Sequence, residues 1–358
     1  MRLKTLFSIL IIAFVAVSCK KDVSEQEDPT IVHEDFKDYD LNASVKSILI
    51  TTKVPVNDKN DSTSLKISHK EQIFFNEKGQ LTQKKMLGSD DKIYEEHFFS
   101  GKSQLEKTIK YNNGIVFETT VIKRNSKNEI YSISKFDSNE QLNEIEKYEY
   151  QNDLLFRKIK LNNQNYEIEK IVYEYKNAQL LEKETLYGRN NQIRIIKKYA
   201  YDERENLIEV TDINAQNEIV LKTINTYSAN NELVQTDYLN KKQQLVRSEK
   251  KKYDEKGRLI YFVVLDETGK QIATETKYND LGKILGYQQY EDDVMTESVS
   301  YSYDSNGFLL ETLDNIERNS PLNSQFEYEI DDKKNWTKKT LLIKNTPLEI
   351  VERTIVYF

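Results

Sequence analysis

The stretch Tyr253–Leu259, Tyr-Asp-Glu-Lys-Gly-Arg-Leu, is one copy of a phrase that the chain repeats along most of its length. An aromatic residue closes one apolar run, turn-forming residues follow, and an apolar residue opens the next run. Clear further copies are Phe75–Leu81, Tyr201–Leu207 and Tyr303–Leu309. Such a repeat constrains the fold more strongly than local propensity, because every copy must build the same supersecondary unit.

The spacing of the phrase predicts the strand length. Successive copies begin 24 to 27 residues apart, at Phe75, Phe99, Arg124, Tyr150, Tyr175, Tyr201, Tyr227, Tyr253, Tyr278, Tyr303 and Ile330. Weaker turns, such as those in Phe136–Leu142 and Asp266–Ile272, halve this period. When the turn residues are subtracted from each half-period, roughly eight residues remain for each strand, which is a usual strand length. Eleven copies, each joining two strands, predict about 22 strands.

The chemistry of the phrase indicates a tight reverse turn. Asp254 at the first turn position can accept a hydrogen bond from the backbone two residues on. Glycine supplies the positive φ that closes a type I turn with a bulge. That slot holds Asn128 and Asn231 in two copies and Glu205 in another, where we expect strain or a different turn. Glycine occupies it in four copies: Gly79, Gly257, Gly282 and Gly307.

Within a repeat, side chains alternate with the two-residue period of a strand. In Ile272–Tyr278, every second residue is Ile, Thr or Tyr, and those between are Ala, Glu and Lys. A long meander of this kind twists until it coils or closes. We therefore predict an all-β fold, a long antiparallel meander of repeated β-hairpins coiled into an open shell or barrel-like sheet. The hydrophobic content of 38% fits a thin layer better than a thick core.

Paired tyrosines two residues apart recur at the ends of the predicted strands. They form ladders on one face of the sheet. This face is either a binding surface for sugars or extended chains, or a packed face of the kind that aromatic residues commonly form in strands. The candidate surface residues are Tyr148, Tyr150, Tyr173, Tyr175, Tyr199, Tyr201, Tyr301 and Tyr303.

The N-terminus predicts a lipoprotein. Residues 1–19 combine basic Arg2 and Lys4 with a short apolar stretch and end in Ala-Val-Ser-Cys, the pattern of a cleaved signal with a lipobox. Cys19, the only cysteine, is the expected attachment site for lipid such as palmitate. Residues 20–39 are expected to be a flexible tether, and residues 40–358 a single β domain.

The phrases Tyr253–Leu259 and Tyr301–Leu309 resemble the YD-repeat, or RHS-type, family, and the likeness covers roughly residues 70–340. The two ends of the domain also resemble short YD-repeat bacterial lipoproteins of unknown function. Large members of the family wind such repeats into a hollow β-shell around a toxin. This chain has no Asp-Pro-x-Gly self-cleavage segment, so the resemblance implies the shell and not the toxin.

Motifs for catalysis, cofactors and metals are missing from the sequence. It contains no phosphate-binding glycine loop, no Gly-x-Ser-x-Gly and no His-Glu-x-x-His. We therefore expect no enzyme, no cofactor and no metal, with His69 and His97 as ordinary strand residues. A net charge of −7 argues against nucleic acid as a partner.

These observations suggest a non-enzymatic β-repeat protein, lipid-anchored in the outer membrane of a Gram-negative bacterium on its periplasmic or surface-exposed face. It would bind a protein or glycan of the cell envelope. A first alternative is an immunity or accessory protein that encloses part of a toxin-like partner. A second is a glycan-active enzyme, which would need two carboxylates facing each other in a cleft; nothing in the repeats distinguishes such a pair.

Overall fold

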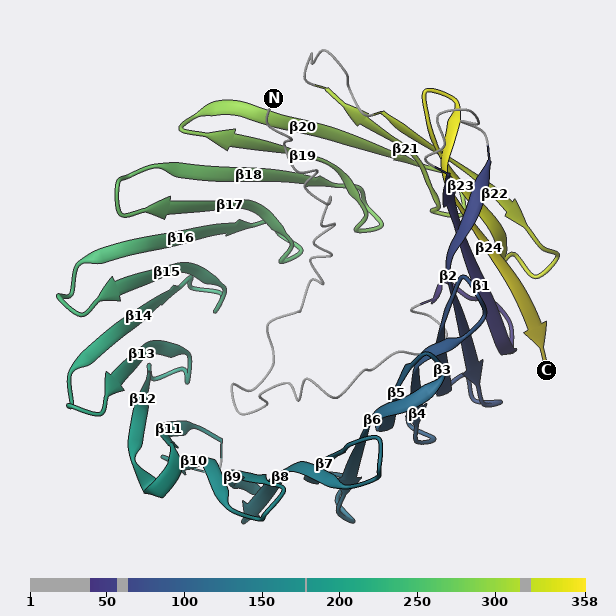
Figure 1. Cartoon of the computed structure of the whole chain (residues 1–358). Helices are drawn as coiled ribbons and strands as arrows, with labels where there is room; N and C mark the ends of the chain where they lie inside the picture. Colours follow the sequence, from purple (N-terminus) through teal and green to yellow (C-terminus); the bar gives the residue numbers. More distant parts are fainter. Residues whose placement is uncertain (1–38, 57–63, 178, 316–322) are drawn as a thin grey trace, which may run out of the picture.

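The computed structural model describes residues 39–56, 64–177, 179–315 and 323–358, which form an all-β structure (Figure 1). The predicted signal peptide, Cys19 and all but the last residue of the predicted tether lie outside the described residues. The described residues contain one short 3-10 helix, η2 (Arg189–Asn191), and 24 strands.

The strands follow one another along the chain at the spacing that the repeat predicts. Their bounds are β1 (Val45–Pro55), β2 (Leu65–Phe75), β3 (Leu81–Gly88), β4 (Ile93–Phe99), β5 (Leu105–Asn112), β6 (Ile115–Arg124), β7 (Ile130–Phe136), β8 (Leu142–Gln151), β9 (Leu154–Asn162), β10 (Glu167–Tyr175), β11 (Leu181–Tyr187), β12 (Ile193–Tyr201), β13 (Leu207–Asn214), β14 (Ile219–Tyr227), β15 (Leu233–Asn240), β16 (Leu245–Tyr253), β17 (Leu259–Asp266), β18 (Gln271–Tyr278), β19 (Ile284–Glu291), β20 (Val294–Tyr303), β21 (Leu309–Asp314), β22 (Ser324–Ile330), β23 (Trp336–Ile343) and β24 (Thr346–Tyr357).

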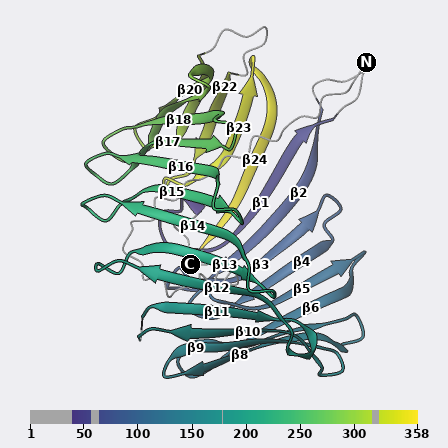
Figure 2. The ribbon, with the colours of Figure 1, turned by 90° about the vertical axis from the view of Figure 1, so that its left-hand side faces the viewer.

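The sheet is a closed antiparallel barrel. Each strand pairs with the next one along the chain, and β1 also pairs with β24, from Val45 opposite Tyr357 to Lys53 opposite Ile350 (Figures 1 and 2). The predicted all-β meander is confirmed, and of the two predicted forms the closed one is present. The repeats account for β2 to β23; the two further strands, β1 and β24, lie outside the repeats and complete the wall.

The barrel is too wide for its own side chains to fill. Neighbouring strands lie about 4.8 Å apart, so 24 strands make a wall roughly 115 Å around. In a barrel of about eight strands the side chains just fill the interior, and wider barrels leave space inside. The wall is therefore a single layer around a wide interior.

Because consecutive strands are antiparallel, the eleven repeat turns all lie at one end of the barrel, which we call the repeat-turn rim. The described chain also begins and ends there, since the backbone N–H of Phe358 donates to the carbonyl of Ser44 at 3.2 Å. The turns that halve the period lie at the other end, the opposite rim.

The turn at Asp254 shows how the phrase reverses the chain. The N–H of Asp254 donates to the Arg258 carbonyl, and the N–H of Gly257 to the Asp254 carbonyl, both at 2.9 Å. Asp254 Oδ1 accepts bonds from the N–H groups of Lys256 and Arg258, at 2.9 and 3.0 Å. Gly79, Gly257, Gly282 and Gly307 all have positive φ, between 73° and 85°.

Glu205 keeps the same turn despite its side chain. Its φ is 65°, and its N–H donates to the Asp202 carbonyl at 3.1 Å, as Gly257 does to Asp254. The strained turn is therefore present and the differently shaped one is not. Asn128 and Asn231 take the same conformation, with φ of 71° and 63°.

One repeat departs from the predicted spacing. After Tyr150 the chain turns through Asn152 and Asp153 alone, with φ of 51° and 65°, the signature of a two-residue type I′ turn. Gln151 consequently pairs with Leu154. The strand β9 opens at Leu154, and Phe156, which the alignment placed at the strand start, lies inside β9 and is 38% exposed.

Buried apolar side chains concentrate near the β1–β24 closure. The larger cluster consists of Leu41, Val45, Ile48, Ile73, Phe75, Leu81 and Phe99. Beside it Asn335, which is fully buried, exchanges bonds with the backbone of Asn42: Asn42 N–H donates to Oδ1 at 2.6 Å, and Nδ2 donates to the Asn42 carbonyl at 2.9 Å. The segment before β1 is thus tied to the turn before β23.

The shortest backbone ladder among the described strands joins β21 to β22. In the described part of these strands only Glu311 with Gln325 and Thr312 with Ser324 are in register. Nearer the repeat-turn rim, the rings of Phe308 and Tyr328 stack with centroids 5.0 Å apart. Side-chain stacking therefore supplements a short backbone ladder here.

The turn geometry predicts opposite effects at equivalent positions. Gly257→Val should lower the free energy of unfolding by about 1–2 kcal/mol, because a β-branched residue must take positive φ. No atom lies within 4 Å of the added Cβ, so the cost is one of backbone conformation. Glu205→Gly should be neutral or stabilising. Urea denaturation of both variants checks this, and equal effects would contradict it.

Candidate functional site

The tyrosines that open the repeat phrase have an internal structural role. Each donates its hydroxyl to the backbone carbonyl of the apolar residue near the start of a preceding odd-numbered strand, 2.7 to 3.1 Å away. These bonds are Tyr150 to Ile130, Tyr175 to Leu155, Tyr201 to Leu181, Tyr227 to Leu207, Tyr253 to Leu233, Tyr278 to Leu259 and Tyr303 to Ile284. Of the predicted surface tyrosines, Tyr150, Tyr175, Tyr201 and Tyr303 therefore link neighbouring repeats.

The remaining predicted tyrosines lie two residues earlier on the same strands; Tyr173 is buried and the other three are partly buried. Tyr173 is 5% exposed, and burial raises the pKa of Tyr173, Tyr199 and Tyr301. Tyr148 donates to Glu146 at 2.9 Å, and Tyr199 bonds Glu184. The packing interpretation thus describes these side chains better than an open binding surface does.

Carboxylates beside the tyrosines are a feature that the sequence reasoning missed. Burial raises the pKa of Glu184, and burial also raises that of Tyr287, which hydrogen-bonds Glu297. Each acid lies on a strand neighbouring that of its tyrosine. The sequence shows Glu184 in β11 and Glu297 in β20, but which tyrosine each acid meets depends on the strand register.

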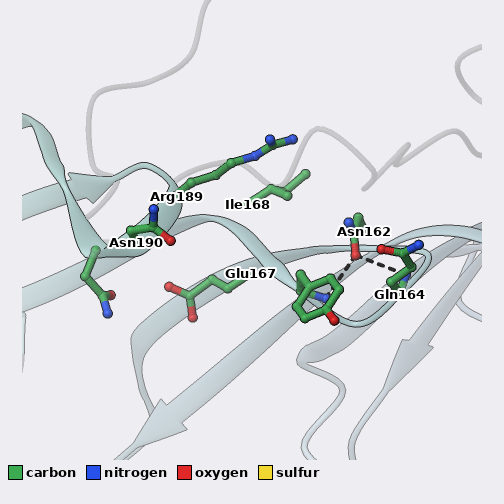
Figure 3. A pocket seen from close by; sticks show the side chains of 8 residues that line it. Asn162, Gln164, Glu167, Ile168, Arg189 and Asn190 are labelled. Carbon is green, nitrogen blue, oxygen red and sulfur yellow. Dashed lines mark hydrogen bonds between the residues drawn. The ribbon is translucent and has the colours of Figure 1, made fainter.

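A cavity of about 570 Å³ lies at the opposite rim, between the turn that joins β9 to β10 and the turn that joins β11 to β12. Figure 3 shows Asn162 and Gln164 on the first turn and Arg189 and Asn190 on the second, with Glu167 nearby. The other lining residues are Tyr166, Ile168 and Asn191. Four of the eight lining side chains are amides.

The β11–β12 turn departs from the common form and shapes this cavity. Asn190 and Asn191 have successive positive φ values of 58° and 57°, a conformation that asparagine tolerates best among side-chain-bearing residues. The N–H of Gly188 closes the loop on the Gln192 carbonyl at 2.8 Å. The sequence indicates this different turn, because residues 188–192 read Gly-Arg-Asn-Asn-Gln where a turn such as Asp-x-x-Gly would otherwise stand.

Two cationic side chains lie at or near the cavity: Lys170 is engaged by neighbouring side chains, and Arg189 is not paired with an acid in the described residues. Lys170 pairs with Glu167 at 3.3 Å, lies 4.8 Å from the centroid of the Tyr187 ring and donates to Asn191. Arg189 has no ion-pair partner within the described ranges. Tyr166, at 66% exposure, adds an accessible ring.

This set of side chains suits a polyhydroxylated ligand. Amide groups donate and accept hydrogen bonds at once, a guanidinium donates several, and an exposed ring offers an apolar surface. The volume lies in the range of small-molecule sites. None of these residues was singled out from the sequence.

The structure places the two candidate histidines apart from this cavity. His69 on β2 contacts the Ser68 hydroxyl at 2.9 Å, and His97 on β4 contacts the Thr108 hydroxyl at 3.2 Å. In the part of the chain that is described, no three His, Cys, Asp or Glu side chains gather as a metal site. Nor do the described residues include a helix with the length and hydropathy needed to cross a bilayer.

The tyrosine bonds between repeats predict a measurable stability cost. Tyr278→Phe removes the 3.0 Å bond to the Leu259 carbonyl and should lower the free energy of unfolding by about 1 kcal/mol. Tyr166→Phe, at an exposed ring, is the matched control and should have no effect. Thermal and urea denaturation measure both; a neutral Tyr278→Phe would contradict the structural role.

Similarity between this chain and known structures is low in sequence. A family model described as "Uncharacterised protein" matches residues 238–348, and no curated protein matches. Solved structures that match include the Photorhabdus luminescens Tc holotoxin pore, with 12% identity and a TM-score of 0.41 over 86% of this chain and 18% of that one. This chain therefore spans under a fifth of that toxin chain.

Porin-like proteins of two Bacteroides species also match. The Bacteroides uniformis protein has 9% identity and a TM-score of 0.28, over 88% of this chain and 99% of its own. The Bacteroides vulgatus protein has 9% identity and a TM-score of 0.22, over 66% and 93%. Likeness at this level carries no information about function.

Proposed function

We propose that this chain is a lipid-anchored, non-enzymatic YD-repeat protein of the Gram-negative outer membrane that binds a glycan of the cell envelope. The observation that carries the proposal is the amide-rich cavity at the opposite rim, with Arg189 and the exposed Tyr166 beside it. An envelope protein is the other partner that a broad β surface would suit.

The position of the cavity agrees with an anchor at Cys19. The described chain enters the barrel at the repeat-turn rim, where Phe358 meets Ser44. Asn162 and Arg189 belong to turns at the other rim. The cavity therefore lies at the end of the barrel away from the rim where the N-terminal segment enters.

The cavity chemistry favours sugar over an apolar ligand. Glycans present hydroxyl groups that pair with amides and guanidinium groups, and the less polar faces of sugar rings pack on aromatic side chains. Asn162 already uses Oδ1 to accept the N–H groups of Gln164 and Tyr166, at 3.0 and 2.9 Å. The turn is therefore preorganised before any ligand arrives, which lowers the entropic cost of binding.

A second function, enclosing part of a toxin-like partner as an immunity or accessory protein, is supported by the closure of the wall. A barrel of 24 strands surrounds more space than its side chains occupy. In that case a partner segment would become protected from protease on binding, while substitutions at Arg189 would leave the binding unchanged.

The anchoring part of the proposal is tested at Cys19. Cys19→Ala should move the protein from the membrane fraction to the soluble fraction, or leave its precursor unprocessed, because the lipidated thiol is lost. Cell fractionation and metabolic labelling with a palmitate analogue measure this. Unchanged fractionation and size would contradict a lipoprotein.

The cavity is tested by glycan-array binding of the soluble Cys19→Ala chain. We expect Arg189→Gln and Tyr166→Ala each to weaken the strongest glycan signal at least about fivefold, equivalent to about 1 kcal/mol. Tyr131→Ala, at a 44% exposed tyrosine on β7, is the matched control and should bind normally. Equal loss in all three variants, or no glycan signal from the parent chain, would overturn the glycan proposal.

A further inference from the structure

A cation is held against the single tryptophan of the chain, near the β1–β24 closure. The guanidinium carbon of Arg353 on β24 lies 3.3 Å from the centroid of the Trp336 ring on β23. Trp336 is 7% exposed. Stacking of this kind orients the guanidinium plane and limits its rotation, so that its nitrogen atoms point in fixed directions.

Most of the hydrogen-bonding capacity of this guanidinium is unused. The Nε and Nη1 atoms of Arg353 are buried and have no hydrogen-bond partner among the residues that the structure describes. An unpaired donor in such a place costs free energy, more so on a charged group. Burial accordingly lowers the pKa of Arg353 to about 10, so the group still carries its charge at neutral pH.

A second cation lies beside the first on the same face. Lys339 is opposite Val351 in the β23–β24 register, and Val351 lies two residues from Arg353 on β24, so the two cations are on one face of the sheet. Its ammonium is 5.1 Å from the centroid of the Phe326 ring. Burial, and to a smaller extent the charge of Arg353, lower the pKa of Lys339, while the charge of Glu349 acts in the opposite direction. Two like charges thus share a partly buried position.

Neither cation has an acidic partner at bonding distance. Within residues 39–56, 64–177, 179–315 and 323–358, no carboxylate forms an ion pair with Arg353 or Lys339, although surrounding lysines are paired, as Lys338 is with Glu329 at 2.7 Å. Asp40 and Glu349 act on the pair only through longer-range charge. Partly buried charges without a partner are costly, and such groups are candidates for binding a ligand of opposite charge.

We propose that Arg353 and Lys339 form a binding site for a carboxylate group, separate from the amide-rich cavity at the other rim. A carboxylate would accept bonds from the guanidinium and the ammonium together, as charge-assisted pairs. The nearby negative charges of Asp40 and Glu349 disfavour a dianion, so the site selects a carboxylate over a phosphate. The carboxylate comes from a uronic acid or from the C-terminus of a peptide.

The single tryptophan makes the site directly observable. Sodium glucuronate, sodium N-acetylalaninate and sodium phosphate would be titrated into the soluble Cys19→Ala chain at constant ionic strength, with Trp336 fluorescence as the readout. We expect a saturable change with at least one carboxylate, with a dissociation constant on the order of 1 mM. Glucuronate alone would indicate a uronic acid, and N-acetylalaninate alone a peptide terminus.

Matched variants separate binding from non-specific charge effects. Lys339→Gln should weaken carboxylate binding at least about tenfold, with circular dichroism unchanged. Lys338→Gln removes the same charge from the neighbouring position, on the other face of β23, and should leave binding within about twofold. A response that does not saturate, tighter binding of phosphate, or equal loss in both variants would overturn the proposal.

Discussion

The backbone hydrogen-bond ladder around the closed wall is the interaction on which this structure depends. A single layer of 24 strands has no thick core in which to bury apolar area, so the ladder must satisfy the polar backbone groups of nearly every residue. Pairing of β1 with β24 removes the two free edges that an open sheet would present. The largest apolar cluster gathers at this closure.

In addition to that ladder, side-chain hydrogen bonds link neighbouring repeats to one another. The hydroxyl of a repeat tyrosine such as Tyr253 bonds the carbonyl of Leu233, 20 positions earlier. Carboxylates such as Glu184 and Glu297 hold the adjacent row of tyrosines. These links use polar groups and half-buried rings, which explains how a chain of 38% hydrophobic residues maintains so long a wall.

Departures from the repeat coincide with the features proposed to bind ligands. The amide-rich cavity forms where the Gly188–Gln192 turn replaces the common turn, and the cation pair joins Lys339 on β23, the last strand of the repeats, to Arg353 on β24, which lies outside them. A regular wall needs its standard residues for structure. Positions outside that pattern are freer to carry binding chemistry.

The sequence by itself determined most of the strands, their antiparallel order and the residues at positive φ in the regular repeat turns, because these follow from local period and turn chemistry around residues such as Asp254 and Gly257. Only the tertiary structure decided that the sheet closes, since accumulated twist and the pairing of Lys53 with Ile350 involve the whole chain. It also decided which side chains meet. Arg189 with Asn162, and Arg353 with Trp336, come together through register and loop shape, which no local pattern encodes.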